Sequence, residues 1–340
     1  MGKIAFVFAG QGAQYSGMGK DFYASSAAAR AVFDEAEALR PGTLTQCFES
    51  DEAVLKETKN TQPDMFAVEL ATAAALTASG IRADMTAGFS LGELAALAYA
   101  GAGSFAEIFQ LVTKRGALMQ QAAEEQPTAM VAALKLSAED VEKLCAEFAN
   151  VYPVNFNCPG QVSCSGLAEE IKAFSAAVKE AGGRAVPLKV KGGFHSPFMK
   201  EAAAAFDKEL ATVDFKTLEI PVYANCNGLP YSEDVVTTLS QQMANPVRWE
   251  TSVRNMIAAG CDTFIEIGPG DTLSGMIKRI DGNVRRYTCG SIEEMNSRKN
   301  SHCHRRFPRH RRSNGEKTRQ PRRQYRCHLC RERSRSERCL

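Results

Sequence analysis

Residues 85–100 read MTAGFSLGELAALAYA, and this segment is the most informative one about the fold class. Its first part, Met85–Phe89, is an apolar run that predicts a buried strand, and the Ala- and Leu-rich segment Leu91–Ala100 predicts a helix. Between them GFSLG at 88–92 has the G-x-S-x-G pattern of a sharp strand-to-helix turn that leaves a serine, here Ser90, exposed. Such a pattern arises by chance in about one chain in ten of this length. The strand before it and the helix after it therefore carry the prediction.

Short apolar runs alternate with helical patterns in residues 1–127, which contain this turn, and in residues 191–297. Strands are expected at Lys3–Ala9 and Thr263–Ile267, and helices at Asp64–Ser79, Phe105–Glu124 and Thr272–Ile280. This alternation is typical of an α/β fold with a largely parallel sheet. With the serine turn added, it predicts an α/β-hydrolase-like parallel-sheet core.

Residues 128–190 follow a different order of elements. The expected strand, helix, strand, strand, helix and strand lie at Met130–Leu134, Ala138–Phe148, Tyr152–Asn157, Gln161–Ser165, Ala168–Ala181 and Arg184–Val190. This βαββαβ order is that of the ferredoxin-like fold. We therefore predict an α/β core, residues 1–127 and 191–297, with a ferredoxin-like subdomain inserted at 128–190.

The composition excludes several classes of protein. The chain has 340 residues, of which 44% are hydrophobic and 24% charged, so it is neither disordered nor fibrous as a whole. No apolar run approaches the length of about eighteen residues that a membrane span needs, and the run Ile4–Ala9 is too short for a signal peptide. Seven cysteines in residues 1–297 show no disulfide or metal-binding spacing. We expect a cytoplasmic protein.

A serine hydroxyl needs a general base at neutral pH, and histidine is the usual one. His195, within GGFHSPFM at 192–199, is the only histidine in residues 1–297. A lone histidine is more often structural, but a serine in a strand-to-helix turn gives this one a catalytic partner. The loop GQGAQ at 10–14 follows the first strand, and its backbone N–H groups could hold an oxyanion. The alternative is an ordinary flexible loop, since the dinucleotide and P-loop spacings are absent.

Seven motifs follow one another along the chain: FVFAGQGAQ at 6–14, GFSLGE at 88–93, KRGALMQ at 114–120, PVNFNCPGQ at 153–161, FHSPFM at 194–199, QMANPVRW at 242–249 and EIGPG at 266–270. In this order the sequence resembles the malonyl-CoA:acyl-carrier-protein transacylases of bacterial fatty acid synthesis, and more broadly the acyltransferase domains of polyketide synthases. The resemblance covers about residues 3–290. It implies ping-pong transfer of a malonyl group from malonyl-CoA to the phosphopantetheine thiol of acyl carrier protein.

The resemblance also implies catalytic roles for particular residues. Ser90 would be the nucleophile that carries the malonyl ester, and His195 its general base. The backbone N–H groups of Gln11 and Leu91 would form the oxyanion hole. In this family the histidine is oriented by a backbone carbonyl near Gln242 rather than by an aspartate.

Three further residues would bind the substrate. By the resemblance, Arg115 would hold the free carboxylate of malonate, because its planar guanidinium matches a carboxylate in two hydrogen bonds. Without the motif, the same residue would be taken as a solvated helix residue paired with a nearby glutamate. Phe194 is the residue that malonyl-selective members carry, and its ring would crowd an α-methyl branch, while Asn157 would have a supporting role. Phe89 departs from the family, which usually has histidine there, and this puts the pocket wall and acyl selectivity in question.

The resemblance implies no metal and no cofactor beyond the CoA thioester and the carrier's phosphopantetheine. Malonyl-CoA and acyl carrier protein are the expected partners, with no membrane or nucleic acid, and a monomer is expected. The main alternative is a thioester hydrolase that uses the same serine turn with water as the acceptor.

Residues 298–340 differ sharply from the rest of the chain. They hold 14 Arg and 2 Lys against 3 Glu, a charge of +13, whereas residues 1–297 carry −11. Arg density with interleaved aromatic residues could mark nucleic-acid binding. Cys327 and Cys330 could mark a zinc site, but no second well-spaced pair exists and the arginines would repel the cation.

A third interpretation of this tail, which we favour, is a frameshift product. Codons allowed for Lys299–Arg312, read one base later, permit KTAIVTGASRGIG, which resembles the opening of a short-chain dehydrogenase such as the ketoacyl-carrier-protein reductase of the same pathway. Such a tail is expected to be disordered, because it has little apolar surface to bury. The nucleotide sequence of codons 290–340 tests this, since codons that cannot spell that motif would exclude it.

Overall fold

The computed structural model describes residues 2–190, 192–232 and 234–297. Their main sheet has five parallel strands in the order β7-β2-β1-β8-β9. The strands are β1 (Lys3–Phe8), β2 (Met85–Gly88), β7 (Val222–Tyr223), β8 (Cys261–Ile267) and β9 (Arg285–Cys289). The predicted parallel-sheet core is confirmed, and the basic tail at 298–340 lies outside the described residues.

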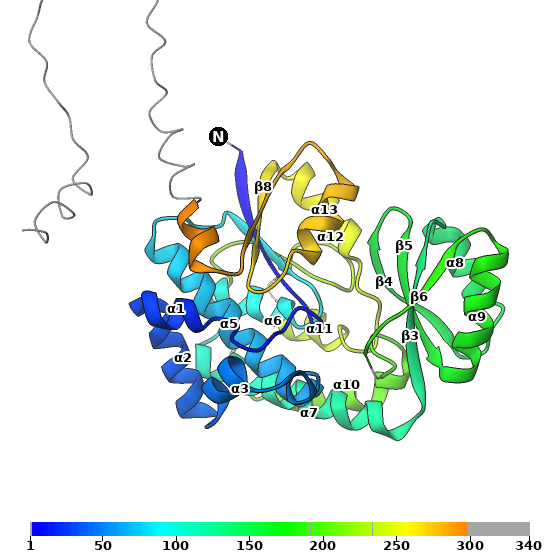
Figure 1. Ribbon diagram of the computed structural model, residues 1–340, viewed down its shortest axis with the longest axis horizontal. Coiled ribbons are helices and arrows are strands. Elements are labelled where there is room, and N and C mark those ends of the chain that lie inside the picture. Colours follow the sequence, from blue (N-terminus) through cyan, green and yellow to red (C-terminus); the bar gives the residue numbers. More distant parts are fainter. Residues whose placement is uncertain (1, 191, 233, 298–340) are drawn as a thin grey trace, which may run out of the picture. The chain divides into compact units, whose positions relative to one another are not determined.

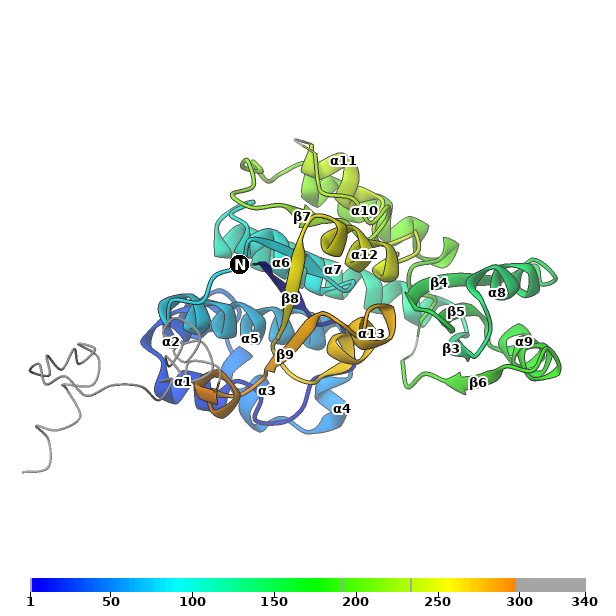
Figure 2. The ribbon, with the colours of Figure 1, turned by 90° about the horizontal axis from the view of Figure 1, so that it is seen from above.

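Strand β1 shows why this sheet is covered on both faces. Its alternate residues Ala5 and Val7 pack on α12 (Trp249–Ala258) and α13 (Thr272–Ile280). Phe6 and Phe8 point the other way, into the larger apolar cluster that includes α5 (Thr58–Ala78), α6 (Gly92–Tyr99) and α7 (Phe105–Glu125). Figure 2 shows α5 and α6 on one side of β8 and α12 and α13 on the other. The remaining helices are α1 (Lys20–Ser25), α2 (Ala27–Leu39), α3 (Thr43–Glu49), α4 (Glu52–Leu55), α10 (Lys200–Leu210) and α11 (Val235–Ser240).

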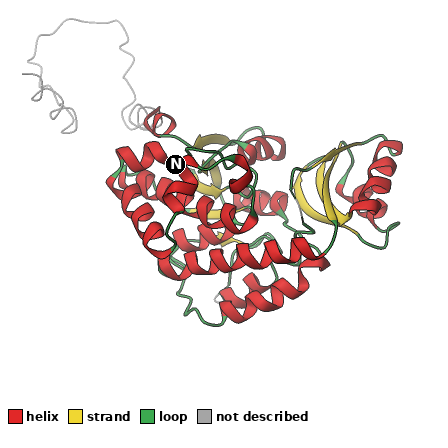
Figure 3. Ribbon diagram, turned by 60° about the horizontal axis from the view of Figure 1, so that its bottom comes forward, coloured by secondary structure: helices red, strands yellow, loops and turns green. Residues whose placement is uncertain are grey.

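The second sheet is antiparallel, with the order β4-β5-β3-β6. It comprises β3 (Thr128–Leu134), α8 (Ala138–Cys145), β4 (Val151–Cys158), β5 (Gln161–Leu167), α9 (Ala168–Glu180) and β6 (Arg184–Pro187). Both helices cover the face of the sheet that is turned away from the parallel sheet (Figures 1 and 3). Val131 and Ala133 of β3 pack under these helices, whereas Met130 and Ala132 line a cleft on the other face. The predicted ferredoxin-like order is confirmed.

Several predicted element bounds were wrong. Helix α5 begins at Thr58, six residues before the predicted Asp64, and it contains Pro63 in its second turn. Proline cannot donate a backbone hydrogen bond, which favours a helix start next to it. Here burial on all sides of α5 outweighs the lost bond. Strand β6 ends at Pro187 rather than at Val190, and α8 ends at Cys145 rather than at Phe148.

Candidate active site

The strand-to-helix turn is present and strained as the sequence predicts. Ser90 lies between β2 and α6 with a φ of 55°, in the left-handed region that non-glycine residues rarely occupy. A Cβ atom at Gly88 would lie 1.8 Å from the carbonyl carbon of Gly92, and one at Gly92 would lie 2.3 Å from the carbonyl oxygen of Phe8. Both glycines are therefore required by close backbone approach.

Ser90 and His195 meet, although 105 residues separate them in the sequence. The Oγ atom of Ser90 lies 2.6 Å from Nε2 of His195, and Nδ1 of His195 lies 3.0 Å from the backbone carbonyl oxygen of Gln242. Because a carbonyl can only accept, Nδ1 carries the proton and Nε2 presents a lone pair to the serine hydroxyl. The arrangement is a serine, a base and a group that orients the base.

His195 is neutral at physiological pH. Burial and, second, the positive charge of Arg115 together lower the pKa of His195 to about 4, against the opposing hydrogen bonds to the backbone of Gln242 and Asn245. A neutral imidazole is the form that can accept a proton from Ser90. Burial and the charge of Arg115 also disfavour the imidazolium that forms when His195 accepts a proton. A negative charge nearby would offset this effect.

Arg115 is fully buried on α7 and reaches Ser90. Its Nη2 atom lies 3.2 Å from Oγ of Ser90 and 2.7 Å from Oε1 of Gln242, and Nε lies 3.2 Å from the same Oε1. Its Nη1 atom donates to Oε1 of Gln62 at 2.8 Å. Burial lowers the pKa of Arg115 to about 10, opposed by Glu93, so the guanidinium stays charged. The alternative of a solvated helix residue is excluded.

A cleft of about 280 Å³ opens above Ser90, between the parallel-sheet core and the cleft-facing side of the second sheet. Its lining includes Gln11, Leu91, Phe194 and Asn157, so all of these predicted site residues lie around one space. Within the described part of the chain, no acceptor is found for the backbone N–H groups of Gln11 and Leu91. Both donors are therefore free for an oxyanion, and that of Leu91 lies at the start of α6.

Two of the lining residues differ in character. Phe194 is 7% exposed and lines the cleft together with His195, its neighbour in the sequence. Asn157, on β4, donates from Nδ2 to Oγ of Ser163 at 3.2 Å, while its Oδ1 is buried with no partner among the described residues. The free Oδ1 leaves an acceptor for a ligand in the cleft.

Comparison with known proteins leads to the same family as the sequence motifs. Residues 5–297 match the acyl transferase domain family. The malonyl CoA-acyl carrier protein transacylase of Bacillus subtilis is 41% identical over 293 residues, which are 84% of this chain and 92% of that protein. The chain belongs to the malonyl CoA-acyl carrier protein transacylase family.

Solved structures of this transacylase family agree in fold. The enzyme from Clostridium perfringens superposes with a TM-score of 0.87 at 34% identity, covering 89% of this chain and 98% of that one. A malonyl-transacylase solved in complex with a type II polyketide acyl carrier protein gives a TM-score of 0.85 at 32% identity, covering 88% and 99%.

Three residues of this transacylase site were not predicted. Asn225 follows β7, and its Oδ1 accepts from the backbone N–H of Ser90 at 2.7 Å while Nδ2 donates to the carbonyl of Gly88 at 2.6 Å. Glu93 and Gln62 also enter the hydrogen-bond network of Arg115 and Gln242. Only Glu93 lay in a recognised motif, and neither the motif nor hydrophobic periodicity signalled its contacts.

The unusual Phe89 of this family member has a clear place. Its ring is half-buried in the cleft wall and meets Trp249 edge to face, with ring centroids 5.8 Å apart. The Nε1 atom of Trp249 is buried and has no hydrogen-bond partner among the described residues. A phenyl ring cannot supply a conventional acceptor, whereas an imidazole nitrogen could.

Neither a metal-binding cluster nor a membrane-spanning helix occurs in the described part of the chain. Among residues 2–190, 192–232 and 234–297, no group of three or more His, Cys, Asp or Glu could hold a metal ion. No helix within these ranges is both long and apolar enough to cross a membrane.

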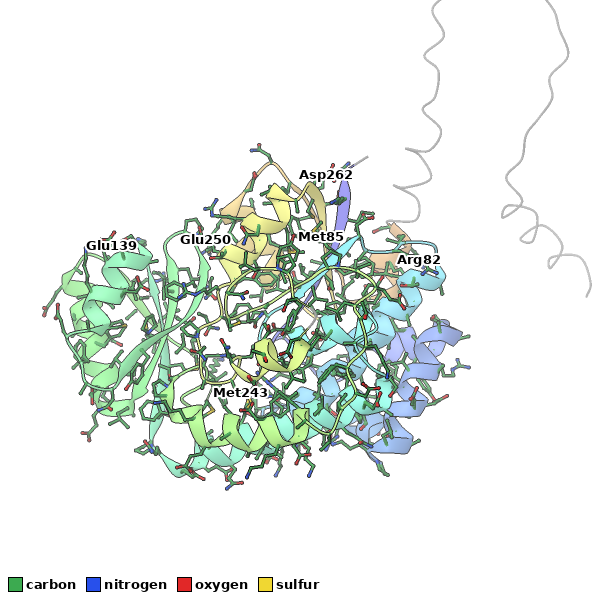
Figure 4. All side chains as sticks on the ribbon, turned by 180° about the vertical axis from the view of Figure 1, so that it is seen from behind. Arg82, Met85, Glu139, Met243, Glu250 and Asp262 are labelled. Carbon is green, nitrogen blue, oxygen red and sulfur yellow. The ribbon has the colours of Figure 1, made fainter. Side chains whose placement is uncertain are left out.

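Figure 4 shows Met243, the neighbour of Gln242, in the main body with Met85 of β2, and Glu139 on the outer helix α8.

Proposed function

We propose that this chain transfers a malonyl group from malonyl-CoA to the phosphopantetheine thiol of acyl carrier protein, through a malonyl ester on Ser90. The observation that carries the proposal is the position of Ser90 Oγ, 2.6 Å from Nε2 of His195 and 3.2 Å from Nη2 of Arg115. One hydroxyl thus lies beside a base and beside a buried cation. The first suits acyl transfer, and the second suits an acyl group that ends in a carboxylate.

In the first half-reaction, Ser90 Oγ attacks the thioester carbonyl while its proton passes to Nε2 of His195. The carbonyl oxygen becomes an oxyanion, which the free N–H groups of Gln11 and Leu91 would stabilise. When the tetrahedral intermediate collapses, the C–S bond breaks and the CoA sulfur takes the proton from His195. The products are malonyl-Ser90 and free CoA.

In the second half-reaction, the carrier's thiol attacks the ester carbonyl after losing its proton to His195. The C–O bond to Ser90 breaks, and the serine oxygen recovers the proton. Water must be a poorer acceptor than the thiol for this to be transfer rather than hydrolysis. The half-buried Phe89 and the buried Phe194 both add apolar surface to the cleft that holds Ser90.

Arg115 would select malonyl over acetyl. A buried guanidinium paired only with neutral amides and a hydroxyl has a strong preference for an incoming carboxylate. The malonyl carboxylate would reach Arg115 between Ser90 and Gln62. Both residues line the cleft and both form a hydrogen bond with Arg115. Phe194 would disfavour a branched α-carbon, and Asn157 would accept a hydrogen bond from the thioester arm.

The remaining parts of the proposal concern organisation and setting. Residues 1–127 and 191–297 would fold as the acyltransferase core, with residues 128–190 as the ferredoxin-like subdomain that closes the cleft. The enzyme would act as a cytoplasmic monomer, with no metal and no cofactor beyond its two thioester-forming partners. The relative solved with an acyl carrier protein supports the choice of carrier as acceptor.

Intact-protein mass spectrometry after mixing with malonyl-CoA tests the function. We expect one malonyl adduct that persists in buffer and is discharged by holo acyl carrier protein. Ser90→Ala should abolish the adduct, whereas Ser175→Ala, which removes a helix-surface hydroxyl bonded to the carbonyl of Ile171, should not. An adduct that water discharges as fast as the carrier would indicate a thioester hydrolase, and no adduct would refute both functions.

A further inference from the structure

Resting on the proposed function, we infer that Glu93 is a positioning residue, which supplies a countercharge to Arg115 and keeps the guanidinium free for the substrate carboxylate. Glu93 lies in the first turn of α6, three residues after the nucleophile, and is 1% exposed. Glu93 and Arg115 share no direct hydrogen bond. The side-chain amide of Gln242 lies between them.

The Gln242 amide joins the two charges in one orientation. Its Oε1 accepts from Nε and Nη2 of Arg115, at 3.2 and 2.7 Å. Its Nε2 donates to Oε2 of Glu93 at 2.7 Å and to the backbone carbonyl of Ser90 at 2.6 Å. A flipped amide would place its N–H groups against the donors of Arg115 and its oxygen against two acceptors. The carboxylate of Glu93 is one of the two acceptors that, with the donors of Arg115, prevent this flip.

Glu93 is itself held from the side away from Gln242. Its Oε1 accepts from the backbone N–H of Asn225 at 2.9 Å and from the hydroxyl of Tyr231 at 2.7 Å. Three donors therefore converge on one buried carboxylate, which is the usual condition for keeping a carboxylate charged away from water. Burial raises the pKa of Glu93 above its ordinary value, and the three donors and the positive charge of Arg115 oppose that rise.

The amide spacer has a functional consequence. A carboxylate in direct contact with Arg115 would occupy the guanidinium face that the substrate needs. A buried guanidinium with no countercharge would be costly to keep in the empty enzyme. With Glu93 one amide away, the charge of Arg115 is balanced, while its Nη2 still reaches Ser90 Oγ. Glu93 thereby contributes to acyl selectivity without contacting the substrate.

The test compares malonyl-CoA with acetyl-CoA in transfer to holo acyl carrier protein. For Glu93→Gln we expect the ratio of kcat/KM for malonyl over acetyl to fall at least tenfold, because the two facing amides compete and Arg115 loses its countercharge. Gln242→Glu, which puts a carboxylate directly on Arg115, should lower the same ratio at least as much. Glu170→Gln is the matched control, because its carboxylate accepts two hydrogen bonds from Asn150 in the second sheet's subdomain.

A purely structural role for Glu93 would lower the melting temperature and reduce both transfers equally, leaving the ratio within twofold of the wild type. That result would overturn the inference. If Glu93→Gln does not fold, Glu93→Asp retains the charge but draws the carboxylate back from Gln242, and an unchanged ratio there would overturn it as well. Loss of the Ser90 adduct in the wild-type protein would instead refute the proposed function, so the two failures are distinguishable.

Discussion

Replacing Arg115 with lysine tests the assignment of the malonyl-binding group most directly. The guanidinium makes four hydrogen bonds, two to Gln242, one to Gln62 and one to Ser90, all in a buried site. Lysine keeps the positive charge and has three donors, so it can still satisfy the two glutamine side chains. It cannot present the parallel pair of N–H groups that a carboxylate accepts from arginine.

The expected cost follows from the lost bond. A hydrogen bond between charged groups contributes about 1.5–3 kcal/mol, and each 1.36 kcal/mol corresponds to a factor of ten in rate. Arg115→Lys should therefore reduce kcat/KM for malonyl-CoA by about 10- to 160-fold. The acetyl group has no carboxylate and never forms this hydrogen bond. The kcat/KM for acetyl-CoA should therefore change by less than about threefold.

Both constants are measured as transfer to holo acyl carrier protein at one pH near 7. Arg254→Lys is the control, because Arg254 forms an exposed ion pair with Glu250 on α12, away from the cleft. Equal losses with malonyl-CoA and acetyl-CoA would refute the reasoning, since they would place Arg115 in the support of Ser90 rather than in carboxylate recognition.

Three further predictions concern the base, the turn and the cleft wall. The pH profile of kcat/KM should fall on the acid side near the pKa of His195, about 4, and Arg115→Ala should move that limb to higher pH, because removing a positive charge raises the pKa of the base; a wild-type limb near 6.5 would contradict this. Asn225→Ala should slow acylation and lower the melting temperature, since two buried backbone groups lose partners at about 1–3 kcal/mol each, and an unchanged melting curve would be evidence against it. Phe89→His should keep transfer and raise the free energy of unfolding in urea by about 1 kcal/mol, because the imidazole gives Trp249 Nε1 an acceptor. Phe89→Leu, which supplies no acceptor, is the control. If both variants lose the same stability, a hydrogen bond between the introduced imidazole and Trp249 is excluded.

The turn at Ser90 could be predicted because its information is local. A strand, two glycines around a serine and a helix lie within sixteen consecutive residues, 85–100, and the structure explains each glycine by a contact shorter than 3 Å. The order βαββαβ could be predicted for the same reason, since each strand and helix has its own periodicity. Resemblance to a family then supplied partners that local patterns could not.

The network behind the nucleophile could not be predicted from local patterns. Arg115 and Gln242 are 127 residues apart, and Ser90 and Asn225 are 135 apart. Asparagine and glutamine have no periodicity that marks a buried role, because their positions depend on which loops the parallel strands bring to one sheet edge. The start of helix α5 was missed for a different reason, because a proline inside a helix is locally unfavourable and burial on all sides of the helix outweighs that cost.

The site links substrate recognition to base strength through one charge. In the free enzyme, burial and the cation Arg115 hold the pKa of His195 at about 4, so the imidazole is a weak base. A carboxylate that binds Arg115 brings a negative charge close to the same imidazole and opposes that depression. The base then strengthens when the correct acyl group is in place. Acetyl-CoA cannot make this change, so discrimination is expected in the acylation step itself as well as in binding.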